Sequence, residues 1–458
     1  MSTTARRVGA LDRPSLGWSD LEGARVGLFG LRTEGAANLR RLRRMGVVPV
    51  VVDDRPSAPA FGGLRVSSGD AGLDALAACE VVVKSPGISR HGPQVAALLD
   101  AGVAVAGGLG LWLHDVDRAR VVCVTGTKGK STTAALAGHL LCGLGQRCLV
   151  AGNIGLPPWD PDAGEDWDFF VVETSSFQAT DVSVSPPVVA VTSLAPDHLD
   201  WHGSVEAYYA DKLSLCSQPG AVLTVADGTS EALREHAQLL GPQVRWVSES
   251  DPELGGSWTD PLGLAGRHSL RDALVARACL VGIGVQAAVD DARLAIAAQG
   301  FAPLEHRFSL IGMVAGVEFV DDSLSTNPLP TLAALDALGD RPVALLVGGQ
   351  DRGLDYRPLA AALGSRHAET FVATLPAAGA RIGETVRAGG SREAAVEVAD
   401  FGDLQRATAA AFSWARTHTY EGVPGVVLLS PAAPSFGQFR DYRERAEAFA
   451  AAMRSCAE

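Results

Sequence analysis

The sequence contains no apolar run of the roughly 18 residues that a helix needs to cross a bilayer. Its first residues, MSTTARRVGALDRPSLGW, lack the apolar core of a secretory signal peptide. The seven cysteines are scattered without any Cys-x-x-Cys pair, which argues against disulfides and against a zinc site. We therefore expect a cytoplasmic protein with no membrane partner and with reduced, mostly buried thiols.

An excess of positive charge is also lacking, since the formal net charge is −13 at pH 7. Nucleic-acid-binding proteins usually present a basic face, so we expect no nucleic-acid partner. An anionic small substrate is still compatible with this charge, because local lysines, helix N-termini and Mg²⁺ can reverse the potential within a cleft. With 458 residues, of which 47% are hydrophobic and 20% charged, the chain is long enough for two or three globular domains.

Three blocks of sequence each alternate short β-rich runs with longer helical patterns, which predicts an α/β fold built on parallel sheets. We place boundaries near Asp117 and Leu304, which gives domains over 1–117, 118–304 and 305–458. Strands are expected at 25–30, 47–52, 80–83, 169–172, 188–193, 343–347, 370–375 and 426–430. Helices are expected at 34–45 and 443–453.

The most informative segment is VVCVTGTKGKSTT at 121–133, in which a β-prone run enters a glycine-interrupted turn before a helical pattern that begins AALAGHLL. Such a turn directs backbone N–H groups and a helix N-terminus at an anion. Lys130 adds a positive charge, and Ser131 or Thr132 can place a hydroxyl on Mg²⁺. The spacing differs from G-x-x-x-x-G-K-[ST], since Val124 stands at the first glycine position. The segment predicts a nucleoside triphosphate site; the alternative is a glycine-rich turn without a ligand.

Two further groups follow expected strands of the same block. Glu173 ends the strand at 169–172, where P-loop enzymes place a Mg²⁺ ligand or a water-orienting group. The alternative is that Glu173 merely precedes a helix capped by residues 174–175. His198 can bind a divalent metal with the flanking aspartates Asp197 and Asp200 orienting it, but a lone loop histidine is more often a surface residue.

Lys212 lies at helical spacing in AYYADK, a pattern in which lysine is normally a solvated surface residue. A desolvated, deprotonated lysine could instead react with CO₂ and ligate Mg²⁺ as a carbamate. Hydroxyl- and amide-rich loops suited to carboxylate recognition occur at 321–327, at 430–436 and around Tyr442, although such residues also form ordinary turns. The glycines after the first strand do not follow G-x-G-x-x-G, so a nicotinamide dehydrogenase is a distant alternative.

In order along the chain, the sequence contains TGTKGKSTT, GNIG, ETSSFQ, PDHLDWHG, YYADK, LAGRHSLRDA, EHRF, DDSLSTN, GGQDRG and SPAAPSFGQF. This ordered set resembles the Mur ligases of peptidoglycan synthesis, most closely their glutamate-adding members, over nearly the whole chain. The resemblance implies an N-terminal Rossmann-like domain, a central P-loop ATPase domain and a C-terminal Rossmann-like domain. It also implies ATP- and Mg²⁺-dependent amide formation between UDP-N-acetylmuramoyl-L-alanine and glutamate through an acyl phosphate, by a protein expected to be a monomer.

The resemblance further implies roles for individual residues. The implied catalytic residues are Lys130, Glu173, His198, Lys212 and Asn153. The implied metal ligands are Ser131, Glu173, His198 and Lys212, the last as a carbamate. The implied ATP contacts are Thr125, Gly126, Thr127, Lys128, Gly129, Lys130, Ser131, Thr132, Asp272, Arg307 and Asp322. The implied contacts of the UDP-linked substrate are Gly30, Asp53, Arg55, Ser85, Pro86, Gly87 and Asn153, and those of glutamate are Thr326, Arg352, Ser435, Phe436 and Tyr442.

The sequence departs from the family pattern mainly around the amino-acid pocket. Leu324 replaces a lysine of the usual Asp-Ser-Lys-Ala-Thr-Asn segment beside the glutamate site, and Pro434 and Phe436 alter the closing loop expected to hold glutamate. Away from that pocket, Ser269 and Asp272 replace asparagines at the expected adenine contacts. Unchanged phosphate-transfer residues beside a changed pocket favour a different amino-acid preference. We therefore expect the branch that adds L-glutamate and relies on a separate epimerase. The alternatives are D-glutamate addition, a folate polyglutamate or diaminopimelate/lysine ligase, and a catalytically silent UDP-sugar- or nucleotide-binding regulator.

Overall fold

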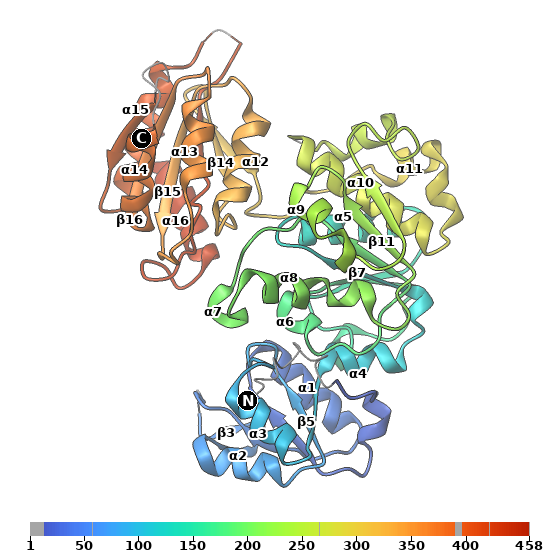
Figure 1. Cartoon of the computed structure of the whole chain (residues 1–458). Helices are drawn as coiled ribbons and strands as arrows, with labels where there is room; N and C mark the ends of the chain where they lie inside the picture. Colours follow the sequence, from blue (N-terminus) through green and yellow to red (C-terminus); the bar gives the residue numbers. More distant parts are fainter. Residues whose placement is uncertain (1–12, 57, 265, 390–395, 421, 458) are drawn as a thin grey trace, which may run out of the picture. The chain divides into compact units, whose positions relative to one another are not determined.

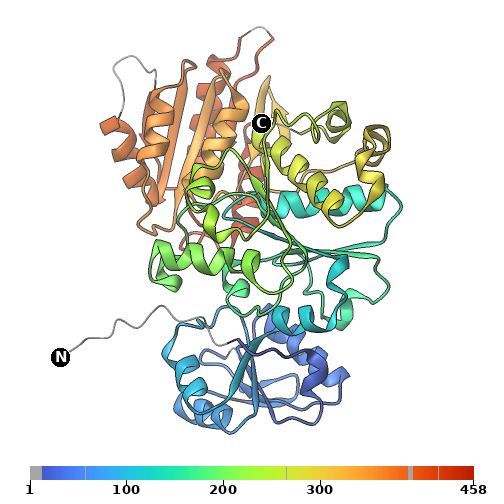
Figure 2. The same cartoon turned by 45° about the vertical axis from the view of Figure 1, so that its right-hand side comes forward.

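The computed structural model describes residues 13–56, 58–264, 266–389, 396–420 and 422–457, without the side chain of Asp200. It contains three six-stranded sheets, each of which is covered by helices, so the predicted α/β class is confirmed (Figures 1 and 2). The chain forms two compact units. The first extends to Gly263 and includes Ser269–Phe301, and the second comprises Leu264–His268 and the chain from Ala302 onward.

The first sheet has the strand order β3-β4-β2-β1-β5-β6 and is parallel except for the β3–β4 pair. Its strands are β1 (Val26–Phe29), β2 (Val50–Val52), β3 (Ala60–Phe61), β4 (Leu64–Ser67), β5 (Val81–Lys84) and β6 (Ala104–Gly107). The accompanying helices are α1 (Thr33–Arg44), α2 (Gly69–Ala77), α3 (Pro93–Asp100) and α4 (Gly108–Asp115). The strand expected at 47–52 begins only at Val50, because the N–H of Val47 donates to Leu42 O at 2.9 Å and closes the end of α1.

The second sheet is wholly parallel, in the order β12-β11-β10-β7-β9-β8. Its strands are β7 (Val121–Thr125), β8 (Cys148–Gly152), β9 (Phe169–Glu173), β10 (Val188–Val191), β11 (Leu223–Asp227) and β12 (Val244–Val247). Its helices are α5 (Lys130–Gly143), α6 (Ser176–Ala179), α7 (Leu199–His202), α8 (Val205–Leu213), α9 (Glu231–Glu235), α10 (Gly266–Gly282) and α11 (Asp291–Ala297). Trp112 of α4 packs edge-on against Phe170 of β9 with ring centroids 5.2 Å apart, so the first two sheets share one apolar core.

The third sheet belongs to the second unit and has the order β13-β14-β18-β15-β16-β17, with β13 and β14 as an antiparallel hairpin. Its strands are β13 (Ser309–Val314), β14 (Val317–Asp321), β15 (Val343–Gly349), β16 (Thr370–Ala377), β17 (Val396–Asp400) and β18 (Val426–Leu429). Its helices are α12 (Pro328–Leu338), α13 (Arg357–Gly364), α14 (Ala378–Gly389), α15 (Leu404–Thr417) and α16 (Tyr442–Ser455). Alternate residues of β15 pack on opposite helical layers: Val343 and Leu345 with α12–α14, and Ala344 and Leu346 with α15 and α16.

Short 3₁₀ helices complete the described elements. They are η1 (Trp18–Leu21), η2 (Arg118–Arg120), η3 (Pro161–Ala163), η4 (Ser214–Ser217), η5 (Ala237–Leu239), η6 (Ser257–Leu262) and η7 (Gln286–Val289). In the described ranges, no helix combines the length and apolar character that crossing a membrane requires. All seven cysteines are free thiols and five of them are buried, as the scattered spacing predicts.

Candidate active site

The loop between β7 and α5 has the geometry of a phosphate-binding loop. Gly126 and Gly129 adopt φ values of 134° and 89°, which only glycine takes without strain. Gly129 caps α5, and the helix begins at Lys130 rather than at the predicted Ala134. The start is earlier because the N–H of Thr133 already donates to Gly129 O at 2.9 Å. Residues 130–132 therefore lie in the first helical turn, where N–H groups have no partner within the helix and attract an anion.

The loop is held by the chain that follows β10. The N–H of Thr127 donates to Ser193 O at 2.9 Å, and the N–H of Lys128 donates to Ser193 Oγ at 2.8 Å. A side chain at Gly126 would place its Cβ 2.2 Å from Thr192 Oγ1. Only glycine at position 126 therefore lets the phosphate loop lie this close to the segment that follows β10. Thr192 and Ser193 thus position the loop, a role that the sequence patterns did not indicate.

Glu173 ends β9, next to β7 in the sheet, and is only 2% exposed. Its Oε1 accepts a hydrogen bond from Asn153 Nδ2 at 3.0 Å, whereas its Oε2 is buried without a hydrogen-bond partner among the described residues. Ser175, and not Glu173, caps α6 by accepting from the N–H of Gln178 at 3.2 Å. A buried, unpartnered carboxylate oxygen beside a phosphate loop fits the oxygen-ligand preference of Mg²⁺.

His198 has φ = 50° and directly precedes α7 as its N-cap, with its side chain 37% exposed. Its ring lies 4.9 Å from that of Phe177 and its Nε2 lies 3.9 Å from Asp197 Oδ2. Burial opposes ionisation of Asp197, but the charges of Lys128 and His198 outweigh it and lower the pKa of that carboxyl. Across the ranges described, no three His, Cys, Asp or Glu side chains converge as metal ligands. The Asp200 side chain lies outside the described residues.

Lys212 on α8 is 3% exposed and not on a solvated face. Its Nζ donates to Gly126 O at 2.9 Å, and Nζ of Lys130 donates to Thr127 O at 3.1 Å. Burial, with a further contribution from the charge of Lys130, shifts the pKa of Lys212 well below the usual lysine range. The two predicted catalytic lysines therefore meet at one loop. Asp272 of α10 borders the same loop, since a Cβ on Gly129 would lie 2.7 Å from Asp272 Oδ1.

The predicted contacts of the UDP-linked substrate lie at the carboxyl edge of the first sheet. Ser85 Oγ donates to Gly30 O at 2.8 Å, and Gly30 has φ = 91°. The carboxylate of Asp53 accepts from the N–H groups of Leu31 and Arg55, each at 2.8 Å. The structure therefore brings Gly30, Asp53 and Ser85 together, in the place where open α/β sheets bind ligands. Asn153, also predicted for this substrate, lies with Glu173 instead.

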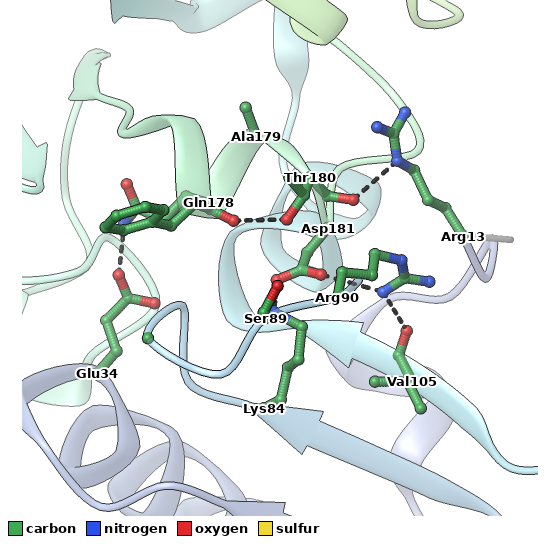
Figure 3. A network of polar contacts seen from close by, with 12 residues as sticks. Arg13, Glu34, Lys84, Ser89, Arg90, Val105, Gln178, Ala179, Thr180 and Asp181 are labelled. Atoms are coloured by element: carbon green, nitrogen blue, oxygen red, sulfur yellow. Dashed lines mark hydrogen bonds and ion pairs between the residues drawn. The ribbon is translucent and has the colours of Figure 1, made fainter. Parts of the chain in front are cut away.

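Pro86 and Gly87 lie on the segment 84–91, here called the 84–91 loop, which leaves β5. Figure 3 shows the polar network beneath it, in which Asp181 contacts both Lys84 and Arg90. At one side of this network, Gln178 donates to Glu34, and burial raises the pKa of Glu34 to about 7.

In the second unit, one arginine connects the loops that carry the predicted glutamate contacts. Arg445 of α16 is buried, and its guanidinium donates to Ser323 O at 2.8 Å, to Ala433 O at 3.1 Å and to Gly348 O at 3.5 Å. These carbonyls follow or end the adjacent strands β14, β18 and β15. The loops bearing the predicted contacts Thr326, Arg352, Ser435 and Phe436 are thereby gathered at one sheet edge.

The remaining predicted residues of this unit have mixed surroundings. Asp322 is buried, which raises its pKa to about 6, and it accepts a hydrogen bond from Ser430 Oγ at 2.7 Å. The charge of Arg307 acts in the opposite direction on that carboxyl. Tyr442 is not in a loop but begins α16, with its ring 5.7 Å from that of His306.

Five residues that position the site had no predicted role. Asp211 lies inside the quoted segment YYADK, so its neighbour Lys212 was a signal that could have drawn attention to it. The others carry no local signal, because their partners lie far away in sequence. They are Thr192, Ser193, Asp181 and Arg445.

Together these features define a P-loop α/β protein whose central sheet is accompanied by two further, Rossmann-like sheets. Residues 124–265 match the Mur ligase middle domain, and residues 306–433 match the glutamate ligase domain of Mur ligases. The chain belongs to the Mur ligase family, as its sequence motifs predict.

Two relatives and one solved structure illustrate the similarity. The chain is 40% identical to proteins from Micromonospora sp. and Salinispora tropica that are both named UDP-N-acetylmuramoyl-L-alanine–L-glutamate ligase. The similarity covers 96% of this chain in both comparisons, and 98% and 99% of the respective relatives. The fold is similar to the crystal structure of MurF from Acinetobacter baumannii, with a TM-score of 0.58, 15% identity and coverage of 98% of this chain and 93% of that one.

Proposed function

We propose that this protein joins the alanine carboxylate of UDP-N-acetylmuramoyl-L-alanine to the amine of L-glutamate in an ATP-dependent step of peptidoglycan precursor synthesis in the cytoplasm. The observation that carries this proposal is the 40% identity, over 96% of the chain, to relatives whose names state those two substrates. The proposal is also supported by the residues beyond the carboxyl ends of three strands: Lys130 after β7, Glu173 at the end of β9 and His198 after β10. An ammonium, a carboxylate and an imidazole are groups that can bind a triphosphate and its Mg²⁺.

The phosphate loop is the proposed site of the ATP triphosphate. The first-turn N–H groups of α5 and the ammonium of Lys130 would bind the β- and γ-phosphates. Ser131, Glu173, His198 and carbamylated Lys212 would hold Mg²⁺ through oxygen and imidazole ligands. When bound, Mg²⁺ offsets the repulsion between the alanine carboxylate and the γ-phosphate.

In the first chemical step, an oxygen of the alanine carboxylate forms a bond to the γ-phosphorus, and the bond to ADP breaks. In the second, the glutamate amine attacks the resulting acyl phosphate, loses a proton and displaces inorganic phosphate. Lys130, whose Nζ donates to the loop carbonyl Thr127 O at 3.1 Å, would stabilise the negative charge of the transferred phosphoryl group. Thr326, Arg352 and Ser435 are the proposed glutamate contacts, with Leu324 leaving an apolar border.

L-glutamate is preferred to D-glutamate because both named relatives carry the L-isomer in their names. A product with L-glutamate requires inversion before D-glutamate can appear in the peptide, so we also propose a separate epimerase that acts on this product. A silent nucleotide-binding regulator would have no need for the buried, unpartnered oxygen of Glu173.

The test supplies ATP, Mg²⁺ and UDP-N-acetylmuramoyl-L-alanine with either L- or D-glutamate, and measures phosphate release and the product mass. We expect turnover with L-glutamate. Turnover with D-glutamate alone would contradict the stereochemical proposal, and turnover with neither would contradict the ligase.

The carbamate is tested with Lys212→Ala, which should lose most activity and recover part of it on addition of short carboxylates. A matched control is Arg147→Ala, because Arg147 forms an exposed ion pair with Asp168 just before the adjacent strands β8 and β9. Full activity of Lys212→Ala would refute the carbamate.

A further inference from the structure

Lysine is rare in this chain. Lysine and arginine together number 39, but only Lys84, Lys128, Lys130 and Lys212 are lysines. Three of the four lie at the phosphate-transfer site, and arginine serves every other cationic position. Lys84 is the remaining one and its side chain is 0% exposed. Lysine and arginine are not interchangeable where they are buried, so the presence of lysine at this position is not a neutral choice.

Lys84 is the last residue of β5 and directly precedes Ser85, Pro86 and Gly87. Its Nζ lies 2.5 Å from Asp181 Oδ2, while Nη1 of Arg90 lies 3.0 Å from Asp181 Oδ1 (Figure 3). One carboxylate, with one oxygen for each cation, therefore holds both ends of the loop that carries predicted contacts of the UDP-linked substrate.

Asp181 belongs to the segment that follows β9 and α6, so it extends from the strand that ends in Glu173. Asp181 can reach Lys84 because the residues at the start of α4 that face Asp181 are glycines. A Cβ on Gly107 would lie 2.7 Å from the Cβ of Asp181, and a Cβ on Gly110 would lie 2.5 Å from Asp181 O. The two glycines thus admit Asp181 into the space under the 84–91 loop.

A second contact ties the same loop to the helix that carries Lys212. His91 Nε2 lies 2.8 Å from Asp211 Oδ2, and the same oxygen lies 2.7 Å from His202 Nδ1. Asp211 is buried and precedes Lys212 on α8. In the middle of the loop, Trp201 Nε1 donates to Gly87 O at 3.4 Å. All these contacts lie within the first compact unit.

We propose that Asp181 and Asp211 are positioning residues that hold the 84–91 loop, and with it the UDP part of the substrate, at a fixed place relative to Glu173 and Lys212. This inference rests on the proposed function. Its physical basis is that the carboxylate and the γ-phosphate must meet at near-bonding distance, and a displacement of about 1 Å can reduce the rate about 100-fold. Two buried ion pairs and a histidine–carboxylate pair restrict the loop to one position.

Lys84→Met is the informative variant, because Asp181→Asn would leave two cations buried without a counter-charge and endanger folding. Met fills the stem of Lys84 and leaves the Arg90–Asp181 pair balanced. We expect kcat to fall and KM for UDP-N-acetylmuramoyl-L-alanine to rise, each by about 10-fold or more, while KM for ATP stays within about twofold. Equal rises in both KM values, or no rise in either, would overturn the proposal.

Amide hydrogen exchange provides a readout that does not need turnover and so separates this inference from the proposed function. Peptides covering the 84–91 loop should exchange faster in Lys84→Met and in Asp211→Asn than in the unaltered chain, with β7 unchanged. Arg147→Met is the control and should match the unaltered chain, since its ion pair is exposed. Unchanged exchange of the 84–91 loop in both variants would refute the positioning role.

Discussion

Replacing Arg445 by Met should weaken the second unit, because this guanidinium holds three loops by their backbone carbonyls. Two of its hydrogen bonds, at 2.8 Å to Ser323 O and 3.1 Å to Ala433 O, have good length, and the third, at 3.5 Å to Gly348 O, contributes little. A hydrogen bond to a charged group contributes about 1.5–3 kcal/mol. Two of them amount to about 3–6 kcal/mol.

The apolar side chain of Met replaces part of the packing of Arg445 and so offsets part of this loss. We therefore expect the free energy of unfolding of the second unit to fall by about 3 kcal/mol. Since about 1.4 kcal/mol corresponds to a factor of ten, amides of β14, β15 and β18 that exchange through opening of this unit should exchange about 100-fold faster. Hydrogen exchange of the full chain measures this directly, because each sheet gives separate peptides. Arg445→Lys should show a smaller effect, since an ammonium lacks the fork that spans two carbonyls.

The matched control is Arg454→Met, an exposed position on the same helix, which should leave exchange unchanged. Acceleration of less than about fivefold in Arg445→Met would show that the three carbonyls find other donors, and the assignment of Arg445 as the connection between the loops would be wrong. In the ligation assay, KM for glutamate should rise in Arg445→Met, because the predicted contacts lie on the loops that it connects.

Three further predictions concern the first unit. The pKa of Glu34 is about 7 in the folded protein against an ordinary value of 4.5, so the folded state binds this proton more strongly than the unfolded state. The stability of the fold should therefore fall as the pH rises from about 4.5 to about 7. Glu34→Gln should flatten the dependence of the unfolding temperature on pH in this window, and an unchanged slope would refute the assignment. Gly129→Ala should weaken ATP binding about 10-fold or more by calorimetry, because φ is 89° there and the new Cβ would lie 2.7 Å from Asp272 Oδ1; unaltered binding would contradict the loop geometry. His202→Leu, which removes the 2.7 Å contact to Asp211, should lower kcat about 10-fold while KM for ATP is retained; a changed KM for ATP with constant kcat would argue against it.

Much of the fold could be predicted from the sequence because its strands are buried on both faces. A parallel strand covered by helices needs a short, continuous apolar run, and the apolar residues 81–83, the run ending at Glu173 and the run at 343–347 all have this form. The start of α5 was wrong by four residues because it depends on a left-handed glycine, whose conformation no helical periodicity reveals. The parallel character of the sheets was predicted, but the strand order of the second sheet was not, because it arises from pairings distant in sequence.

The surroundings of single side chains could not be predicted in the same way. Asp181 is 97 residues from Lys84, and Arg445 is 122 residues from Ser323. Such contacts arise only when separate strands are placed side by side in the fold. The sequence around one partner does not indicate which residue the other partner is. The burial of Lys212 is similar: helical spacing alone favours solvent, but the fold places the side chain against the phosphate loop, where Nζ donates to Gly126 O at 2.9 Å from 86 residues away.

For the proposed carbamate, the electrostatics of the phosphate loop favours lysine over arginine at position 212. A guanidinium stays charged even when buried, whereas a buried ammonium can lose its proton. Burial and the neighbouring charges of Lys130 and Lys128 both lower the pKa of Lys212, so they favour the neutral amine, which is the form that adds CO₂. The predicted carbamate is an anion, and the same two cations that disfavour the ammonium would stabilise it. For the proposed ligase, the positive loop would act in one direction throughout: it would favour the unprotonated lysine, stabilise its anionic carbamate and bind the triphosphate.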